Sequence, residues 1–212
     1  MFKPKFIISK EGLRWFIGFL VLACFLMPLS VTAALVSLSL GVLASLFFRI
    51  PLRQAPQGAG LVLSPADGKI VSIDEVEETR FVKNRCTRVS IFLSLFDVHM
   101  NYAPLEGVVD WIDYQKGRFH MAFEPKASEN NENQRIGISS SQGKILVRQI
   151  AGAIARRIVL FKKVSQRVQS GERIGMIKFG SRVEIYMPKS WALKVRTGDR
   201  VAGGLTILAE VA

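Results

Sequence analysis

The sequence predicts a β-rich domain, an all-β sandwich or small barrel, preceded by a hydrophobic helical hairpin. Three observations support this prediction: an uncharged apolar run near the N-terminus, an alternation of period two in the rest of the chain, and frequent glycine-containing turns. With 212 residues, the chain has room for one domain of ordinary size after the hairpin. We therefore divide it into residues 1–53 and residues 54–212.

The apolar run extends from Trp15 to Phe48 and contains no charged residue. A continuous helix over this run would be roughly 50 Å long, whereas the hydrocarbon core of a bilayer is ~30 Å thick. Pro28 interrupts the run, which favours two short helices. Basic residues flank both ends, and such residues are retained on the cytoplasmic side. We expect a hairpin that dips into or thinly spans the cell membrane, with the domain on the cytoplasmic face.

Period-two alternation is strongest in three segments, which we expect to be strands: Thr87–Leu95, Lys144–Ile150 and Arg182–Met187. Turn signals separate the expected strands at Asp67-Gly68, Gly107, Gly143, Gly171, Gly198-Asp199 and Gly203-Gly204. Short strands between such turns are typical of a sandwich or barrel. The polar stretch Pro125–Arg135 has no apolar periodicity, so we expect an exposed loop there, either a connector or a lid.

The formal charge of +12 narrows the classes of partner. A basic domain tethered to a bilayer is attracted to anionic headgroups at about 1 kcal/mol per Lys or Arg near the surface. We prefer this interpretation to nucleic-acid binding.

Cys24 and Cys86 are expected to be free thiols, because a bridge would have to join the apolar run to the domain. No metal site is expected, since the chain has two histidines and no pair with metal-ligand spacing.

Three short motifs follow one another along the chain. Ser64–Gly68 (SPADG) opens the domain, Phe96–Asn101 (FDVHMN) ends the clearest strand, and Phe179–Ser181 (FGS) lies near the C-terminus. Together, and in this order behind an apolar N-terminus, they resemble the short bacterial and archaeal form of phosphatidylserine decarboxylase. That family is made as a self-cleaving proenzyme that depends on a pyruvoyl group. The resemblance covers essentially the whole chain.

The resemblance implies cleavage between Gly180 and Ser181, which yields chains 1–180 and 181–212 that stay together as an α/β heterodimer, with a higher oligomer left open. Ser181 would become the pyruvoyl group, so neither a metal nor pyridoxal phosphate would be needed. His99 would take the proton of the Ser181 hydroxyl, and Asp67 would hold the imidazole in the useful tautomer.

The implied substrate is phosphatidylserine in the bilayer, and the products are phosphatidylethanolamine and CO₂. The amine of the serine headgroup would form a Schiff base with the pyruvoyl ketone. After CO₂ is lost, His99 would return a proton to the carbon that carried it. Asp97 is expected to orient the loop that carries His99, whereas His120 has no motif around it and is taken as structural.

Two alternatives remain open. A decarboxylase of archaetidylserine or another serine phospholipid would carry the same motifs. A membrane-tethered binding module is the alternative from another class, because Val168–Gly204 is similar to the hammerhead hairpins of biotinyl and lipoyl domains. In such a module, Lys189 would be the nearest approximation to the modifiable lysine.

Overall fold

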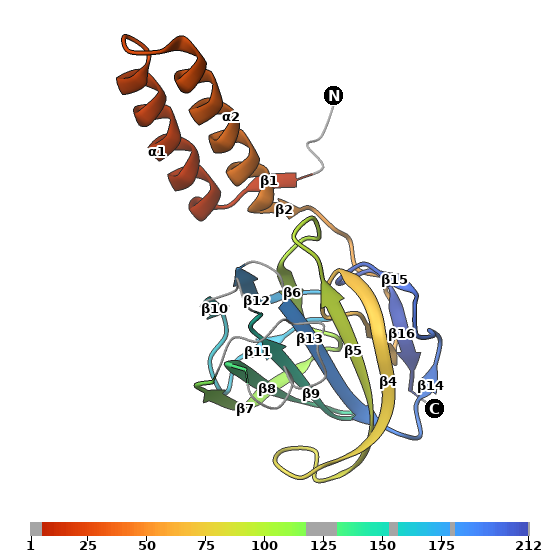
Figure 1. The fold of residues 1–212 in the computed structure, drawn as a ribbon. Helices are drawn as coiled ribbons and strands as arrows, with labels where there is room; N and C mark the ends of the chain where they lie inside the picture. The colour runs from red at the N-terminus through yellow and green to blue at the C-terminus, as the bar shows by residue number, and fades with distance from the viewer. Residues whose placement is uncertain (1–5, 118–130, 153–156, 179–180, 212) are drawn as a thin grey trace. The chain divides into compact units, whose positions relative to one another are not determined.

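The computed structural model describes residues 6–117, 131–152, 157–178 and 181–211 (Figure 1). The chain divides into two compact units, Met1–Leu52 and Arg53–Ala212. We call the first the hairpin unit and the second the β unit, and we describe each by itself.

The hairpin unit contains two helices of equal length, α1 (Lys10–Leu26) and α2 (Val31–Phe47). Each begins at a serine that accepts a hydrogen bond from a backbone N–H, Ser9 from Gly12 and Ser30 from Ala33. Pro28 lies in the turn between the helices, so the predicted division into two short helices is confirmed. The flanking strands β1 (Phe6–Ile8) and β2 (Arg49–Pro51) pair antiparallel.

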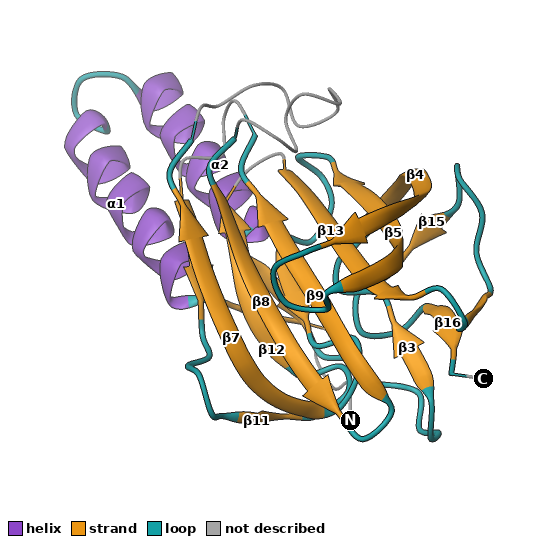
Figure 2. Cartoon of the chain, turned by 90° about the horizontal axis from the view of Figure 1, so that it is seen from below, coloured by secondary structure: helices purple, strands orange, loops and turns teal. Residues whose placement is uncertain are grey.

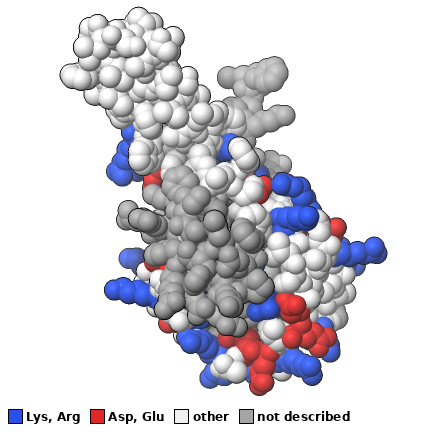
Figure 3. All heavy atoms as spheres, in the orientation of Figure 1, with Lys and Arg blue, Asp and Glu red and all other residues white. Residues whose placement is uncertain are grey.

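The two helices contact each other through small residues. Most of the buried positions are glycine, alanine or serine: Gly12, Ala23, Ala34, Ser37, Gly41 and Ser45. A Cβ at Gly41 would lie 2.8 Å from the Cβ of Phe19, so the close approach requires glycine there. Large apolar side chains instead point outward, as at Phe25 (71% exposed) and Leu29 (73%). Figure 3 shows the helical surface without charge except near one end. None of the described helices is both long and apolar enough to cross a membrane.

The β unit is built on an antiparallel eight-stranded sheet that curls into a half-barrel (Figure 2). In spatial order its strands are β11 (Arg167–Val168), β7 (Gly107–Gln115), β8 (Asn133–Ser140), β9 (Gly143–Ile150), β13 (Ser181–Pro188), β5 (Asn84–Leu93), β4 (Gly68–Glu78) and β15 (Arg200–Val201). The three predicted strands correspond to β5, β9 and β13, and the described part of this unit contains no helix. The β-rich prediction is therefore confirmed.

Two three-stranded sheets complete the β unit. One has the order β10 (Arg157–Leu160), β12 (Arg173–Lys178), β6 (Met100–Tyr102), and the other β14 (Ala192–Leu193), β16 (Ile207–Glu210), β3 (Leu61–Leu63). The aliphatic core draws on both small sheets and on one face of the large sheet, which we call the inner face. Since side chains alternate along a strand, every second residue of β5, β9 and β13 lies on this face. These residues include Val89, Ile91, Leu93, Ile145, Val147, Val183, Ile185 and Met187.

The opposite, outer face of the same sheet carries buried charge. On β13 the residues between the core positions are Arg182, Glu184 and Tyr186. The Tyr186 hydroxyl donates to Glu184 at 2.7 Å, and the Arg148 guanidinium lies 3.6 Å from the same carboxylate oxygen. Burial, the Glu184 charge and the hydrogen bond to it raise the pKa of Tyr186 to about 12, although Arg148 opposes the shift.

The expected exposed loop at Pro125–Arg135 is wrong for its last residues. Strand β8 begins at Asn133, and its first three side chains are buried. Their polar groups find partners within the sheet, since Arg135 donates to Asp113 and to Gln115 of β7. Residues 118–130, with His120, lie outside the described residues.

The two cysteines are free, as predicted: Cys24 is exposed and Cys86 is buried. Burial, together with the charge of Glu78, raises the pKa of the Cys86 thiol to about 11.

Candidate active site

Ser181 and Asp67, two of the three candidate catalytic residues, lie at one end of the eight-stranded sheet. Ser181, the first residue of β13, pairs with Leu93, the last residue of β5. Strand β4 begins at the same end, because a Cβ at Gly68 would lie 2.1 Å from the carbonyl oxygen of Phe92. Gly68 also has φ +148°, which a side chain would strain, so the Asp-Gly pair of the first motif fixes Asp67 here.

Ser181 is fully buried on the inner face, in line with Val183 and Ile185. Its hydroxyl oxygen has no hydrogen-bond partner among the residues that the structure describes. Buried polar atoms usually have a partner, and those that lack one often belong to functional sites. The hydroxyl is thus poorly explained by a purely structural role.

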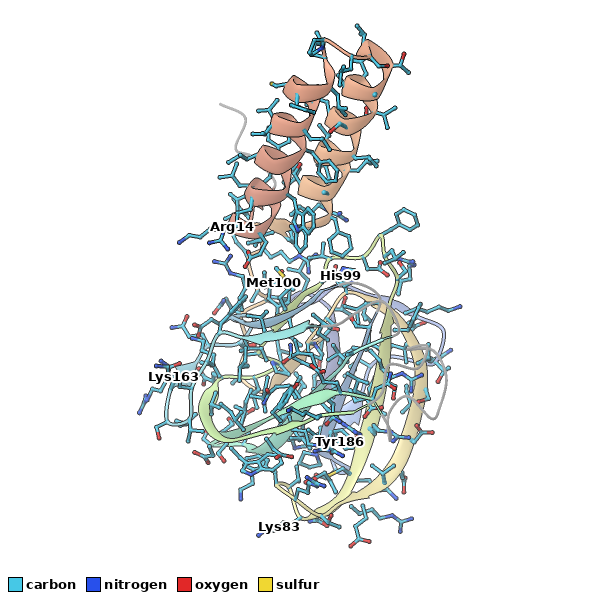
Figure 4. The ribbon with its side chains drawn as sticks, turned by 60° about the vertical axis from the view of Figure 1, so that its left-hand side comes forward. Arg14, Lys83, His99, Met100, Lys163 and Tyr186 are labelled. Carbon is cyan, nitrogen blue, oxygen red and sulfur yellow. The ribbon has the colours of Figure 1, made fainter. Side chains whose placement is uncertain are left out.

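His99 follows a tight turn at the end of β5. Asp97 closes this turn by accepting hydrogen bonds from the backbone N–H and the hydroxyl of Ser94, so the expected orienting role of Asp97 fits the structure. The His99 carbonyl then accepts from the Ile177 N–H at 3.1 Å, which extends the pairing of β6 with β12. The imidazole is 3% exposed. Figure 4 shows His99 at the opposite end of the β unit from Lys83, which lies in the β4–β5 turn.

Asp67 has a partner that the sequence did not predict. Both of its carboxylate oxygens accept hydrogen bonds from the Arg53 guanidinium at 2.7 Å, and the Gly203 N–H is 3.3 Å away. Burial would lower the pKa of Arg53, but the hydrogen bonds and charge of Asp67 outweigh it and raise the pKa. The same guanidinium lies 5.4 Å from the ring centroid of Tyr102. In this state the structure joins Asp67 to Arg53 and not to the imidazole.

The site also contains a buried amide pair that the sequence did not predict. The Gln149 amide donates to the Asn101 side-chain oxygen at 2.7 Å, and both residues are fully buried. Asn101 ends the FDVHMN motif, and Gln149 takes the place where the alternation of Ile145 and Val147 calls for an apolar residue. A polar residue at a core position is the signal that could have revealed the pair.

The chain is similar to known proteins over almost its whole length. Residues 40–209 match the family model described as phosphatidylserine decarboxylase. The chain is 41% identical to a phosphatidylserine decarboxylase proenzyme of Carboxydothermus hydrogenoformans, over 99% of both chains. It is 43% identical to a protein of the same name from Symbiobacterium thermophilum, over 97% of this chain and 96% of the relative. A third, from Desulfotalea psychrophila, is 40% identical over the full length of both. Because the family model matches most of the chain and these relatives cover almost all of it, the chain belongs to the phosphatidylserine decarboxylase family.

Proposed function

We propose that the chain is a phosphatidylserine decarboxylase that cleaves itself before Ser181 and converts phosphatidylserine to phosphatidylethanolamine and CO₂. The observation that carries the proposal is the Ser181 hydroxyl, which is buried and lacks a hydrogen-bond partner within the described residues. It stands at the cleavage position of a chain whose relatives are named as proenzymes.

Self-cleavage uses the chain's own groups. The Ser181 oxygen attacks the carbonyl carbon of Gly180, and the peptide bond is exchanged for an ester. Elimination across the Cα–Cβ bond of residue 181 then releases the Gly180 carboxylate. Hydrolysis of the remaining unsaturated amine frees ammonia and leaves the pyruvoyl ketone. His99 accepts the hydroxyl proton in the first step, because a serine is a weak nucleophile without a base.

The residues at the end of the sheet fit a group formed from Ser181. When present, the pyruvoyl group supplies the electron sink for the carbon that loses CO₂. His99 holds the proton that this carbon receives, and its nearly complete burial keeps bulk water away from the imidazole. Asp67 supports the imidazole only if its carboxylate leaves Arg53, so the ion pair of these two residues is a resting arrangement in our proposal.

A membrane role for the hairpin unit is part of the proposal. Small residues at the helix contact and large apolar residues on the outside are the reverse of a water-soluble helix pair. We place the hairpin in the cell membrane, dipping into it, with the β unit on the cytoplasmic face. Removing residues 1–52 should move the protein from the membrane fraction to the supernatant. Equal turnover of vesicle-borne substrate by the shortened protein would contradict a role in substrate access.

In this proposal, the C-terminal strands share only their architecture with the hammerhead hairpins of biotinyl and lipoyl domains. The carrier alternative would need a displayed lysine. Lys189, the nearest approximation, lies 2.8 Å from a carboxylate oxygen of Glu75 on β4.

Intact mass spectrometry tests the proposed function. Wild-type protein should yield two chains, 1–180 and 181–212, and the small chain should resist Edman sequencing because its N-terminus is a ketone. Ser181→Ala should remain one chain without decarboxylase activity. Full-length wild-type protein with decarboxylase activity would disprove the mechanism. Decarboxylation rates of ether-linked and ester-linked serine phospholipids, assayed side by side, would distinguish archaetidylserine from phosphatidylserine as the substrate.

A further inference from the structure

The buried amide pair of Asn101 and Gln149 has unused hydrogen-bonding capacity. One bond joins the two side chains, from the Gln149 nitrogen to the Asn101 oxygen. The Asn101 nitrogen and the Gln149 oxygen are buried and have no partner in the described parts of the chain. If both amides were turned over, the same bond would leave one nitrogen and one oxygen again. The pair therefore offers one donor and one acceptor side by side.

The pair lies on the same inner surface as the candidate catalytic residues. Gln149 on β9 is directly opposite Val183 on β13, and Ser181 is two residues before Val183 on the same face. Diagonal neighbours of this kind are about 7 to 8 Å apart across a sheet, within reach of a small ligand. On the facing sheet, His99 precedes Asn101 by two residues and continues the same pairing with β12. His99 and Asn101 therefore share a face.

Strand β12 leaves room for the pair. Gly175 is opposite Asn101 in the sheet, and a Cβ there would lie 2.9 Å from the Gln149 nitrogen and 2.7 Å from the carbonyl oxygen of Val159. The glycine allows the Gln149 side chain to cross from the large sheet to Asn101. Three strands, β9, β6 and β12, thus cooperate to hold two polar groups inside an aliphatic core.

We propose that this amide pair binds the serine headgroup of the substrate, with the Asn101 nitrogen donating to its α-carboxylate and the Gln149 oxygen accepting from its α-amine. The inference rests on the proposed function and identifies which part of the lipid the site binds. A serine headgroup offers an acceptor and a donor on one carbon, which matches the groups that the pair leaves unused.

The neutrality of the pair suits the reaction. A buried guanidinium would bind the carboxylate strongly as an ion pair, and that attraction would be lost when the carboxylate becomes CO₂. Only interactions that are stronger in the transition state than in the ground state accelerate the chemical step, and interactions that weaken on the way to it slow that step. An amide donor orients the carboxylate with a weaker bond, so less stabilisation of the ground state has to be given up.

The test compares Asn101→Leu with Asn133→Leu. Asn133 is an equally buried asparagine on the outer face, where its oxygen accepts from Arg148 and its nitrogen donates to the Asn131 carbonyl. Mature protein is treated with borohydride to reduce the ketone, so binding is measured without turnover. Calorimetry then gives the affinities for dihexanoyl phosphatidylserine and for dihexanoyl phosphatidylethanolamine, which lacks the carboxylate.

Wild-type protein should prefer the serine lipid, and Asn101→Leu should reduce that preference about 10- to 100-fold, the usual effect of removing a buried hydrogen bond. Asn133→Leu should keep it. Gly175→Ala, which displaces the Gln149 side chain without removing either amide, should act like Asn101→Leu. An unchanged preference in Asn101→Leu overturns the inference.

If Asn101→Leu remains uncut, Gly175→Ala decides by the same ratio. If both remain uncut while Asn133→Leu matures, the pair serves maturation and the inference about the substrate is wrong. Failure of the proposed function looks different, because wild-type protein would then neither cut itself nor release CO₂.

Discussion

The two faces of the eight-stranded sheet both bury polar groups but treat them differently. On the outer face, Glu184 is bonded to Tyr186 and lies beside Arg148. On the inner face, Ser181 Oγ and part of the Asn101–Gln149 pair have no partner among the described residues. Strand β13 contributes residues to both faces. Side chains alternate along a strand, so Ser181 and Glu184 lie on opposite sides of the sheet.

This difference distinguishes buried polar groups that stabilise the fold from those that would take part in the reaction. A buried polar group stabilises a fold only if its hydrogen bonds are made, and leaving one unmade costs about 1–3 kcal/mol. The inner face accepts this cost at the end of the sheet where the proposed cleavage position lies. On the outer face the buried Glu184 carboxylate avoids this cost through Tyr186 and Arg148, although the neighbouring Ser90 hydroxyl oxygen also lacks a partner among the described residues. Substitutions on the two faces should therefore fail in different assays.

The largest expected effect is on the inner face. His99→Ala should slow self-cleavage by about 10² to 10⁴-fold, because a positioned general base is lost. Asp67→Asn should slow it less, since Asp67 acts on the reaction only through other side chains. A time course of chain separation on a denaturing gel measures both rates. Cleavage of His99→Ala at the wild-type rate would remove His99 and Asp67 from the mechanism.

An intermediate effect is expected on the outer face. Glu184→Gln leaves Arg148 buried without its carboxylate, and breaking a buried pair costs about 3–5 kcal/mol of unfolding free energy. Denaturant unfolding measures the loss, and self-cleavage should continue. Glu172→Gln is the control, because its ion pair with Lys162 is partly exposed and should contribute about 1 kcal/mol or less. Loss of cleavage in folded Glu184→Gln would contradict the prediction that the outer face affects stability and not self-cleavage.

The smallest effect concerns Glu78, in the turn between β4 and β5. Burial acts to raise its pKa, but hydrogen bonds from the backbone N–H groups of Arg80, Phe81 and Val82 outweigh burial and lower it. A lowered folded pKa stabilises the protein above the ordinary carboxyl pKa, and this contribution disappears as the pH falls through the lowered value.

Glu78→Gln should therefore cost about 1–2 kcal/mol near neutral pH and much less near pH 3. Unfolding midpoints measured across that range test the sign. A difference between wild type and variant that grows towards acid would show that the pKa is raised instead.

Local patterns were enough to predict some of these features. The strands β5, β9 and β13 follow from period two, and the helix break follows from Pro28, because both depend on neighbouring residues. The partnership of Arg53 with Asp67, by contrast, joins a residue before the first motif to one inside it through three-dimensional folding. Gln149 meets Asn101 across two different sheets, a contact that no periodicity encodes. The polar start of β8 has the composition of a loop, and the hydrogen-bond partners that make it a strand lie on another strand.

The position of Ser181 at the start of a central strand bears on what happens after the chain is cut. Strand β13 remains paired with β5 along its whole length, from Ser181 to Pro188, and with β9 on its other side. The C-terminal fragment also supplies β14, β15 and β16, which belong to two different sheets. The fragment is thus interwoven with the larger chain and could leave only by unfolding both. Cutting would create two new chain ends yet no separable subunit, and the order of events would be fixed: the protein must fold first and be cut afterwards.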